Sequence, residues 1–294
     1  MHTEHLASAP RLGPRYAVAL LPGRGRSHRL PDTELVLDDV HVDPSRLAAY
    51  CRLCGFGLDG TLPTTYPHVL AFAVQVRLMS ERGFPLRLPG LVHVRQRITR
   101  WRRIDACAVL ALRVRAERLR AHPRGALVDL VSELTVDGVP GWLGRGTYLA
   151  RGATAVAGVA DPPEPTEVRT AHPVARWRAG PDIGRRYARI TGDVNPIHLH
   201  PLSARLFGFP SAIAHGMWSA ARCVAVVGGR LPEAHSVDVA FRSPVPLPSD
   251  LELFLAHRAE GWDLTLRPRH GGRAHLVASV RQGPPWNSSP GPRR

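Results

Sequence analysis

The chain has 294 residues, of which 44% are hydrophobic and 21% are charged, a composition that excludes a largely disordered protein and suits about two ordinary domains. The formal net charge of +15 raises the question of nucleic acid, but helix-turn-helix, zinc-finger and aromatic RNA-binding patterns are missing. Lysine is absent, and the 39 arginines are spread along the chain. We therefore expect no nucleic-acid partner. The arginines favour a solvated surface, or one that attracts an anionic ligand.

The two ends of the chain look loose. Residues 1–10 mix His, Glu and Pro without the apolar core of a signal peptide, and no apolar run reaches 18 residues. We expect no membrane span and a cytoplasmic location. Residues 1–14 and the Pro/Gly/Ser-rich tail 283–294 are expected to be irregular and flexible.

Cys51 and Cys54 have CxxC spacing within a predicted helix at 45–55. Neither a second cysteine pair nor a nearby histidine pair completes a zinc site. A redox pair would need a preceding strand and a turn, which the pattern lacks. Two half-buried thiols on one helical face are the better interpretation.

The first half continues with a stretch that is apolar on nearly every face, residues 66–79, which predicts a buried helix. Residues 90–98 then alternate as a strand does. Further strands are predicted at 106–116, 126–136 and 142–150.

The second half repeats this order after a Pro- and Glu-rich break at 159–170. A predicted helix at 215–227 precedes a strand that begins at residue 236, and three more strands are predicted at 251–258, 262–268 and 274–281.

The two halves therefore look like copies of one unit. Helix and strand are similarly spaced, with 25 residues from His68 to His93 (93 − 68) and 23 from His215 to Asp238 (238 − 215). A helix buried on all sides must be enclosed, and a curved antiparallel sheet can enclose it. We predict an α+β double hot dog, two units in which such a sheet wraps around a central helix. The expected divisions are 1–158, a linker at 159–170, 171–282, and a flexible tail at 283–294.

The chemistry concentrates in the second half. A predicted helix at 183–190 ends near Gly192, and Asn195-Pro196 is expected to keep the following positions out of helix. A carboxylate (Asp193), an amide (Asn195) and an imidazole (His198) are thus crowded into six residues of loop, which can aim a water-activating pair into one cleft. Alternatively, Asp193 and Asn195 only form a turn.

A second segment, His215-Gly216-Met217, opens the predicted central helix. A helix N-terminus offers free N–H groups and partial positive charge to a developing oxyanion. The two segments together favour an active site over a simple turn.

Asp193-Val-Asn195-Pro196-Ile-His198, with Ala212-Ile-Ala-His215-Gly216-Met217 downstream, resembles the signature of the MaoC-like dehydratases, the (R)-specific enoyl-CoA hydratases. The resemblance covers roughly residues 174–280 and implies that Asp193 and His198 hold the catalytic water. It further implies that the backbone N–H of Gly216 stabilises the enolate-like oxygen. It implies a role for Asn195 in orienting the loop and the water, although a turn-former before Pro196 is an equal alternative. His215 is expected to support the loop rather than to transfer protons.

The resemblance implies neither a metal nor another cofactor, because the substrate itself carries coenzyme A or a phosphopantetheine arm. The sequence departs from the family at His200, where an acidic residue is common, and in the central helix, where Ser219 is the only candidate for an expected hydroxyl. The first half has no copy of the loop pattern, so His68 and His93 are expected to be structural. One site per chain follows, with the first half as a wall of the substrate site.

The leading functional prediction is hydration of trans-2-enoyl thioesters, or dehydration of (3R)-hydroxyacyl thioesters, on coenzyme A. The same reaction on an acyl carrier protein, in fatty acid or polyketide synthesis, is the first alternative. A hot-dog thioesterase would use a carboxylate on or near the central helix, and the absence of Asp and Glu from 215–227 counts against it. A non-catalytic acyl-thioester-binding or assembly subunit is the alternative from another class. We expect a monomer or a homodimer.

Overall fold

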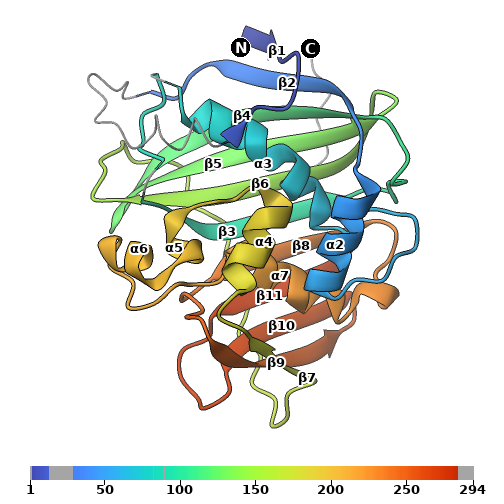
Figure 1. Cartoon of the computed structure of the whole chain (residues 1–294), viewed down its shortest axis with the longest axis vertical. Helices are drawn as coiled ribbons and strands as arrows, with labels where there is room; N and C mark the ends of the chain where they lie inside the picture. The colour runs from blue at the N-terminus through green and yellow to red at the C-terminus, as the bar shows by residue number, and fades with distance from the viewer. Residues whose placement is uncertain (1, 13–28, 82, 89, 284–294) are drawn as a thin grey trace.

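The computed structural model describes residues 2–12, 29–81, 83–88 and 90–283. They form a sheet of eleven strands in the order β1-β2-β4-β5-β6-β3-β8-β11-β10-β9-β7 (Figure 1). The first half contributes β1 (His2–His5), β2 (Thr33–Val40), α2 (Pro44–Cys54), α3 (Tyr66–Met79), β3 (Leu91–Arg100), β4 (Leu110–His122), β5 (Gly125–Val136) and β6 (Val139–Arg151). The second half contributes β7 (Ala175–Ala179), α4 (Ile183–Thr191), α5 (Pro196–Leu199), α6 (Pro201–Leu206), α7 (Gly216–Ala225), η1 (Gly228–Arg230), β8 (His235–Phe241), β9 (Ser249–Arg258), β10 (Gly261–Pro268) and β11 (Leu276–Gln282).

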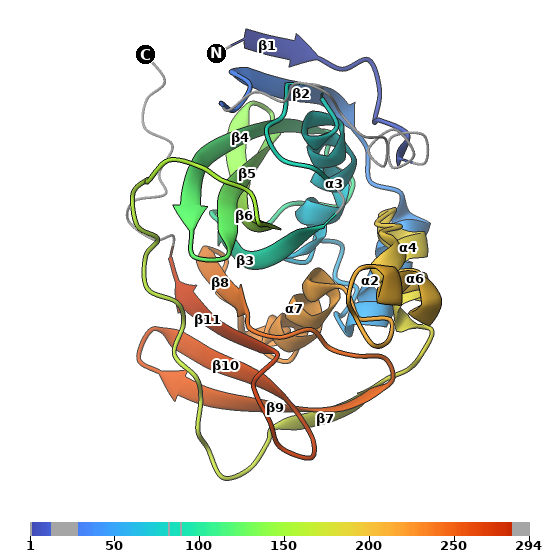
Figure 2. The same ribbon diagram turned by 90° about the vertical axis from the view of Figure 1, so that its left-hand side faces the viewer.

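Helix α3 has the bounds that its apolar run predicts, and it is buried on nearly every face. Figure 2 shows β3 to β6 curling around it. A polar residue within this core, Gln75, donates its amide N–H to Ser132 Oγ on β5 at 2.9 Å. This bond offsets the cost of burying the amide beside the sheet.

Helix α7 occupies the corresponding place in the second half, against β8, β11, β10 and β9 (Figure 2). It ends at Ala225, two residues before the predicted end, and the short 3-10 helix η1 follows. The two halves each wrap a curved antiparallel sheet around a central helix, so the fold is an α+β double hot dog.

Strands β3 and β8 join the halves. They pair antiparallel from Arg95 opposite Ala240 to Arg100 opposite His235. Across this seam the guanidinium of Arg95 donates to both carboxylate oxygens of Asp238, at 2.9 and 2.5 Å. Arg95 also donates to the carbonyls of Pro162 and Pro163, at 2.6 and 2.9 Å. The predicted linker 159–170, which has no helix or strand, is thereby bound to the seam.

Three elements differ from the sequence-based expectations. Residues 2–5 were expected to be loose, but they form β1, which pairs in parallel with β2. Strand β7 was not predicted; it pairs with β9 at the far edge of the sheet. The strand expected at 106–116 begins later, at Leu110, and extends to His122. Residues 13, 14 and 284–294 lie outside the described part of the chain.

Cys51 and Cys54 lie in α2 as free thiols, as predicted, but both are fully buried, where half-buried thiols were expected. Burial raises the pKa of Cys51 to about 11 and that of Cys54 to about 12. Thiols that stay protonated at neutral pH are poor nucleophiles and poor metal ligands. Among the described residues, no helix combines the length and the apolar character that crossing a membrane requires.

Candidate active site

The loop that carries Asp193 begins where α4 ends. Gly192 caps the helix in the left-handed conformation, with φ of 80°, and its N–H donates to Ala188 O at 2.7 Å. Glycine adopts this conformation without the strain that a side chain would bring. Next to it, Thr191 Oγ1 donates to Tyr187 O at 3.0 Å and accepts from the Asp193 N–H at 3.2 Å. The turn and the threonine together fix the direction in which the chain leaves α4.

Asn195 caps the one-turn helix α5, with its side-chain oxygen 3.4 Å from the Ile197 N–H. This corrects the expectation that Asn195-Pro196 keeps the next residues out of helix. Proline restricts the residue before it, but its own fixed φ and missing N–H suit the first position of a helix. His198 therefore lies on α5 rather than in open loop. The expected turn also forms, because the Asn195 N–H donates to Asp193 Oδ1 at 3.3 Å.

The imidazole of His198 is held by one hydrogen bond, from Nδ1 to the carbonyl of Ile213, at 2.8 Å. A carbonyl can only accept, so Nδ1 carries the proton and Nε2 of the neutral ring keeps its lone pair. Burial, together with the nearby His215, lowers the pKa of His198 to about 3. The ring is therefore neutral at physiological pH and can accept a proton.

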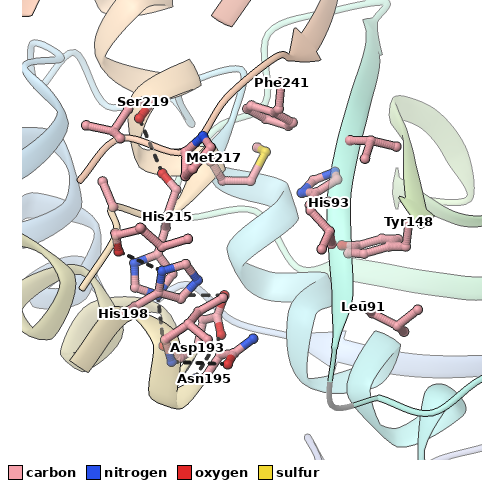
Figure 3. Close-up of a pocket in the computed structure, with 18 of the residues that line it drawn as sticks. Leu91, His93, Tyr148, Asp193, Asn195, His198, His215, Met217, Ser219 and Phe241 are labelled. Carbon is pink, nitrogen blue, oxygen red and sulfur yellow. Dashed lines mark hydrogen bonds and ion pairs between the residues drawn. The ribbon is translucent and has the colours of Figure 1, made fainter. Parts of the chain in front are cut away.

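His215 stacks on His198, with ring centroids 3.7 Å apart and planes at 27°. Its Nε2 donates to the main-chain carbonyl of Asp193 at 3.0 Å and lies 3.7 Å from Asp193 Oδ2. Burial lowers the pKa of His215 to about 4. His215 thus ties the start of α7 to the loop between α4 and α5 (Figure 3).

The three side chains converge in space. One ligand-type atom from each of Asp193, His198 and His215 lies within 4.8 Å of those of the other two. The carboxylate side chain is 23% exposed, whereas both histidines are buried. The polar edge of the cluster is therefore the carboxylate, beside two neutral rings.

One carboxylate and two histidines are also the donor types of some metal sites. Here His198 Nδ1 and His215 Nε2 are engaged with carbonyl oxygens. The lone pairs that remain are those of His198 Nε2 and His215 Nδ1, and each can accept a hydrogen bond from a water.

The cluster faces a cavity of about 220 Å³, many times the ~10–15 Å³ that one water needs. Gly216 also lines this cavity, as do Asn195 and Ser219 (Figure 3). From the first half come His68, Val69, Phe72, Leu91, His93 and Tyr148. The cavity therefore lies between the halves.

His68 and His93 belong to the first-half wall. The ring of His93 stacks on Tyr148 with centroids 4.5 Å apart and contacts Phe241 at 5.0 Å. Burial lowers the pKa of His68 to about 4 and that of His93 to about 3. Both rings are thus neutral packing elements of the wall at pH 7.

Gly216 is the first residue of α7, whose first-turn N–H groups have no acceptor within the helix. A Cβ at this position would lie 3.0 Å from Cε1 of Phe241, closer than a side chain normally packs. The glycine lets the aromatic ring and the helix N-terminus share one end of the cavity. Ser219, one turn further on, has its Oγ 3.5 Å from the His215 carbonyl.

Sequence reasoning missed Tyr148 and Phe241, because aromatic residues in strands are usually core residues. His200, which departs from the family pattern, is exposed, and its Nδ1 accepts from the Leu202 N–H at the start of α6. It caps a helix at the surface.

A carboxylate and a neutral imidazole beside the N-terminus of a buried helix, in a double hot dog, define a hydro-lyase of the hot-dog class. The chain belongs to the MaoC-like dehydratase family. The family model described as a MaoC like domain matches residues 159–263.

Two relatives and one solved structure show how far the similarity extends. The 3-hydroxyacyl-thioester dehydratase X of Mycobacterium tuberculosis is 39% identical over 267 residues, covering 91% of this chain and 95% of that protein. A crystal structure of the HtdX protein of the same organism has a TM-score of 0.76 at 37% identity, covering 85% of this chain and 99% of that one. The 3-hydroxybutyryl-CoA dehydratase of Methylorubrum extorquens is 41% identical over 71 residues, 23% of this chain and 45% of that protein.

Proposed function

We propose that the chain catalyses the reversible addition of water to trans-2-enoyl thioesters, giving (3R)-hydroxyacyl thioesters, with coenzyme A as the carrier of the acyl group. One observation carries the proposal. A carboxylate oxygen of Asp193 and one ring nitrogen from each of His198 and His215 lie within 4.8 Å of one another, beside the first turn of α7. A water that makes two hydrogen bonds of ordinary length, ~2.8 Å each, can bridge groups at this separation.

In hydration, Asp193 and the neutral Nε2 of His198 accept hydrogen bonds from this water. Its oxygen attacks carbon 3 of the enoyl group while the pair takes up one of its protons, and the C2=C3 electrons shift toward the thioester carbonyl. The Gly216 N–H donates to the resulting enolate oxygen. The pair then returns a proton to carbon 2 on the same face, so one water has been added and the pair regains its starting state.

Asn195 and His215 position the loop that carries Asp193. Asn195 fixes the turn between Asp193 and α5. The hydrogen bond from His215 to the Asp193 carbonyl supports the loop and leaves proton transfer to Asp193 and His198. This chemistry requires proton transfer and oxyanion stabilisation, which the chain's own groups supply, so we propose that neither a metal nor another cofactor takes part.

Coenzyme A is favoured by two exposed arginines, Arg124 and Arg151, which line the same cavity as the catalytic cluster. Their guanidinium groups suit the phosphates of a coenzyme A arm. An acyl carrier protein, which presents the same arm, is the alternative carrier. A thioesterase is disfavoured because α7 contains neither Asp nor Glu. The homodimer and the cytoplasmic location stay predictions.

The experiment is hydration of crotonyl-CoA by the purified single chain, followed as loss of enoyl-thioester absorbance. We expect Asp193→Asn to lower kcat/KM by ~10²–10⁴. Asp182→Asn is the matched control, because Asp182 lies at the other end of α4, where its side chain makes no capping hydrogen bond. It should stay within about twofold of wild type.

Full activity in Asp193→Asn would refute the mechanism. Wild-type activity without a partner would exclude a purely non-catalytic subunit. A much higher kcat/KM with a carrier-bound crotonyl group would show that the acyl carrier protein, and not coenzyme A, is the preferred carrier of the acyl group.

A further inference from the structure

Helix α2 of the first half lies against the helix that leads into the catalytic loop. Asp43 caps the N-terminus of α2, because its Oδ1 accepts from the N–H groups of Ser45 and Arg46, at 2.8 and 3.2 Å. Arg46 lies in the first turn of α2, and its half-buried side chain crosses to α4 (Figure 1 shows the two helices side by side). Its Nε donates to Ile190 O at 2.5 Å and its Nη2 to Thr191 O at 3.2 Å.

These two carbonyls lie directly before the loop that carries Asp193. They belong to the last turn of α4, where carbonyls have no partner within the helix and the helix dipole is negative. A guanidinium fork satisfies both and complements the dipole. Only Gly192 separates the second carbonyl from Asp193, and the side chain of Thr191 accepts from the Asp193 N–H.

The other end of α2 contacts the second catalytic segment. Its carbonyls at Leu53 and Cys54 accept from Trp218 Nε1 at 3.4 Å and Arg222 Nη1 at 3.3 Å. Both donors lie on α7, the helix that begins with Gly216. Helix α2 is therefore bonded to α4, which precedes Asp193, and to α7, which follows His215.

From this geometry we infer that Arg46 is a positioning residue of the active site: it holds the last carbonyls of α4 and so sets Asp193 against His198 and His215. The first half thus supplies part of the alignment of a site whose catalytic groups all belong to the second half. Arg46 does not itself line the cavity, so we expect its loss to lower kcat more than it raises KM. The expected loss of kcat rests on the proposed hydratase function. The expected loosening of the loop that carries Asp193 does not.

The test compares Arg46→Met, Arg46→Lys and the control Arg52→Met. Methionine keeps the unbranched stem but has no donor, and lysine restores a cation with donors that can reach one carbonyl. Arg52 lies exposed on the same helix. In the hydration assay we expect Arg46→Met to lower kcat by ~10–100-fold, the scale of an ångström-sized misplacement, with KM within about twofold. Arg46→Lys should recover part of the loss, and Arg52→Met should equal wild type.

Amide hydrogen exchange gives a readout that does not depend on turnover. Arg46→Met should speed exchange in peptides covering 190–198 by at least about tenfold, because local opening of the loop becomes easier, and should leave β4 and β5 unchanged. Exchange at wild-type rates, or a kcat within twofold of wild type in an otherwise active enzyme, would overturn the inference. If wild type itself fails to hydrate enoyl thioesters, the exchange result still decides whether Arg46 holds the loop.

Discussion

Acidification should unfold this protein well above the pH at which its carboxylates are protonated, because its buried histidines are neutral. Burial is the main cause that lowers the pKa of five imidazoles to about 3 or 4: those of His68, His93, His198, His215 and His235. In the unfolded chain they take up protons near the ordinary value of ~6.5. The unfolded state therefore binds more protons between pH 6.5 and about 4, so stability falls as the pH falls through this window.

The size of the effect follows from linkage. Between pH 7.0 and 5.5, an imidazole that titrates only in the unfolded state removes ~1.2 kcal/mol of unfolding free energy. Five such groups remove ~6 kcal/mol, which is comparable with the ~5–15 kcal/mol of a typical domain. Urea unfolding followed by tryptophan fluorescence at both pH values measures this loss.

One variant checks the assignment to individual rings. His93 is stacked on Tyr148 and touches Phe241, so phenylalanine can replace it with similar packing. His93→Phe should reduce the difference between the two pH values by ~1.2 kcal/mol. A wild-type difference below ~2 kcal/mol, or the same pH dependence in His93→Phe, would refute the reasoning.

Two glycines give further predictions. A Cβ at Gly184 would lie 2.0 Å from the backbone oxygen of His198, so Gly184→Ala should displace the catalytic segment and lower kcat by ~100-fold or more. Gly229→Ala, where a Cβ meets open space, is the control and should stay within about twofold; equal losses would contradict the steric explanation. Gly216→Ala should lower kcat/KM ~10-fold by pushing the Phe241 ring from its place. Adding Phe241→Leu should restore most of this activity, and a double variant no better than the single one would exclude ring displacement as the cause.

The central helices and most strands could be predicted, because the spacing of apolar residues along the sequence shows which faces are buried. Residues 66–79 are apolar on nearly every face, which predicts a buried helix that a curved sheet can enclose. β1 could not be predicted, because it has four mostly polar residues on an outer edge and owes its place to pairing with β2. β7 likewise has only five residues, two of them exposed arginine side chains. Short edge strands depend on partners that are remote in sequence.

Within the candidate site, the grouping of residues that lie close together in the sequence could be predicted. Asp193, Asn195 and His198 fall within six residues, and His215 follows at the start of a recognisable helix. The contacts of Arg46 with α4 could not be predicted, because Arg46 binds main-chain carbonyls 144 and 145 residues away. Every residue has a carbonyl, so no residue type marks the acceptor.

Joining the halves through β3 and β8 within a single polypeptide has a consequence for how such a protein can diverge. When two identical hot-dog subunits form a homodimer, every substitution appears in both subunits. A substitution in the central helix that widens the cavity wall of one subunit therefore also changes the central helix that supports catalysis in the other. In the fused chain, α3 lines the cavity with His68, Val69 and Phe72, so a substitution there can reshape the cavity without changing the sequence of α7. The acyl group accepted can thus drift independently of the machinery that handles the water.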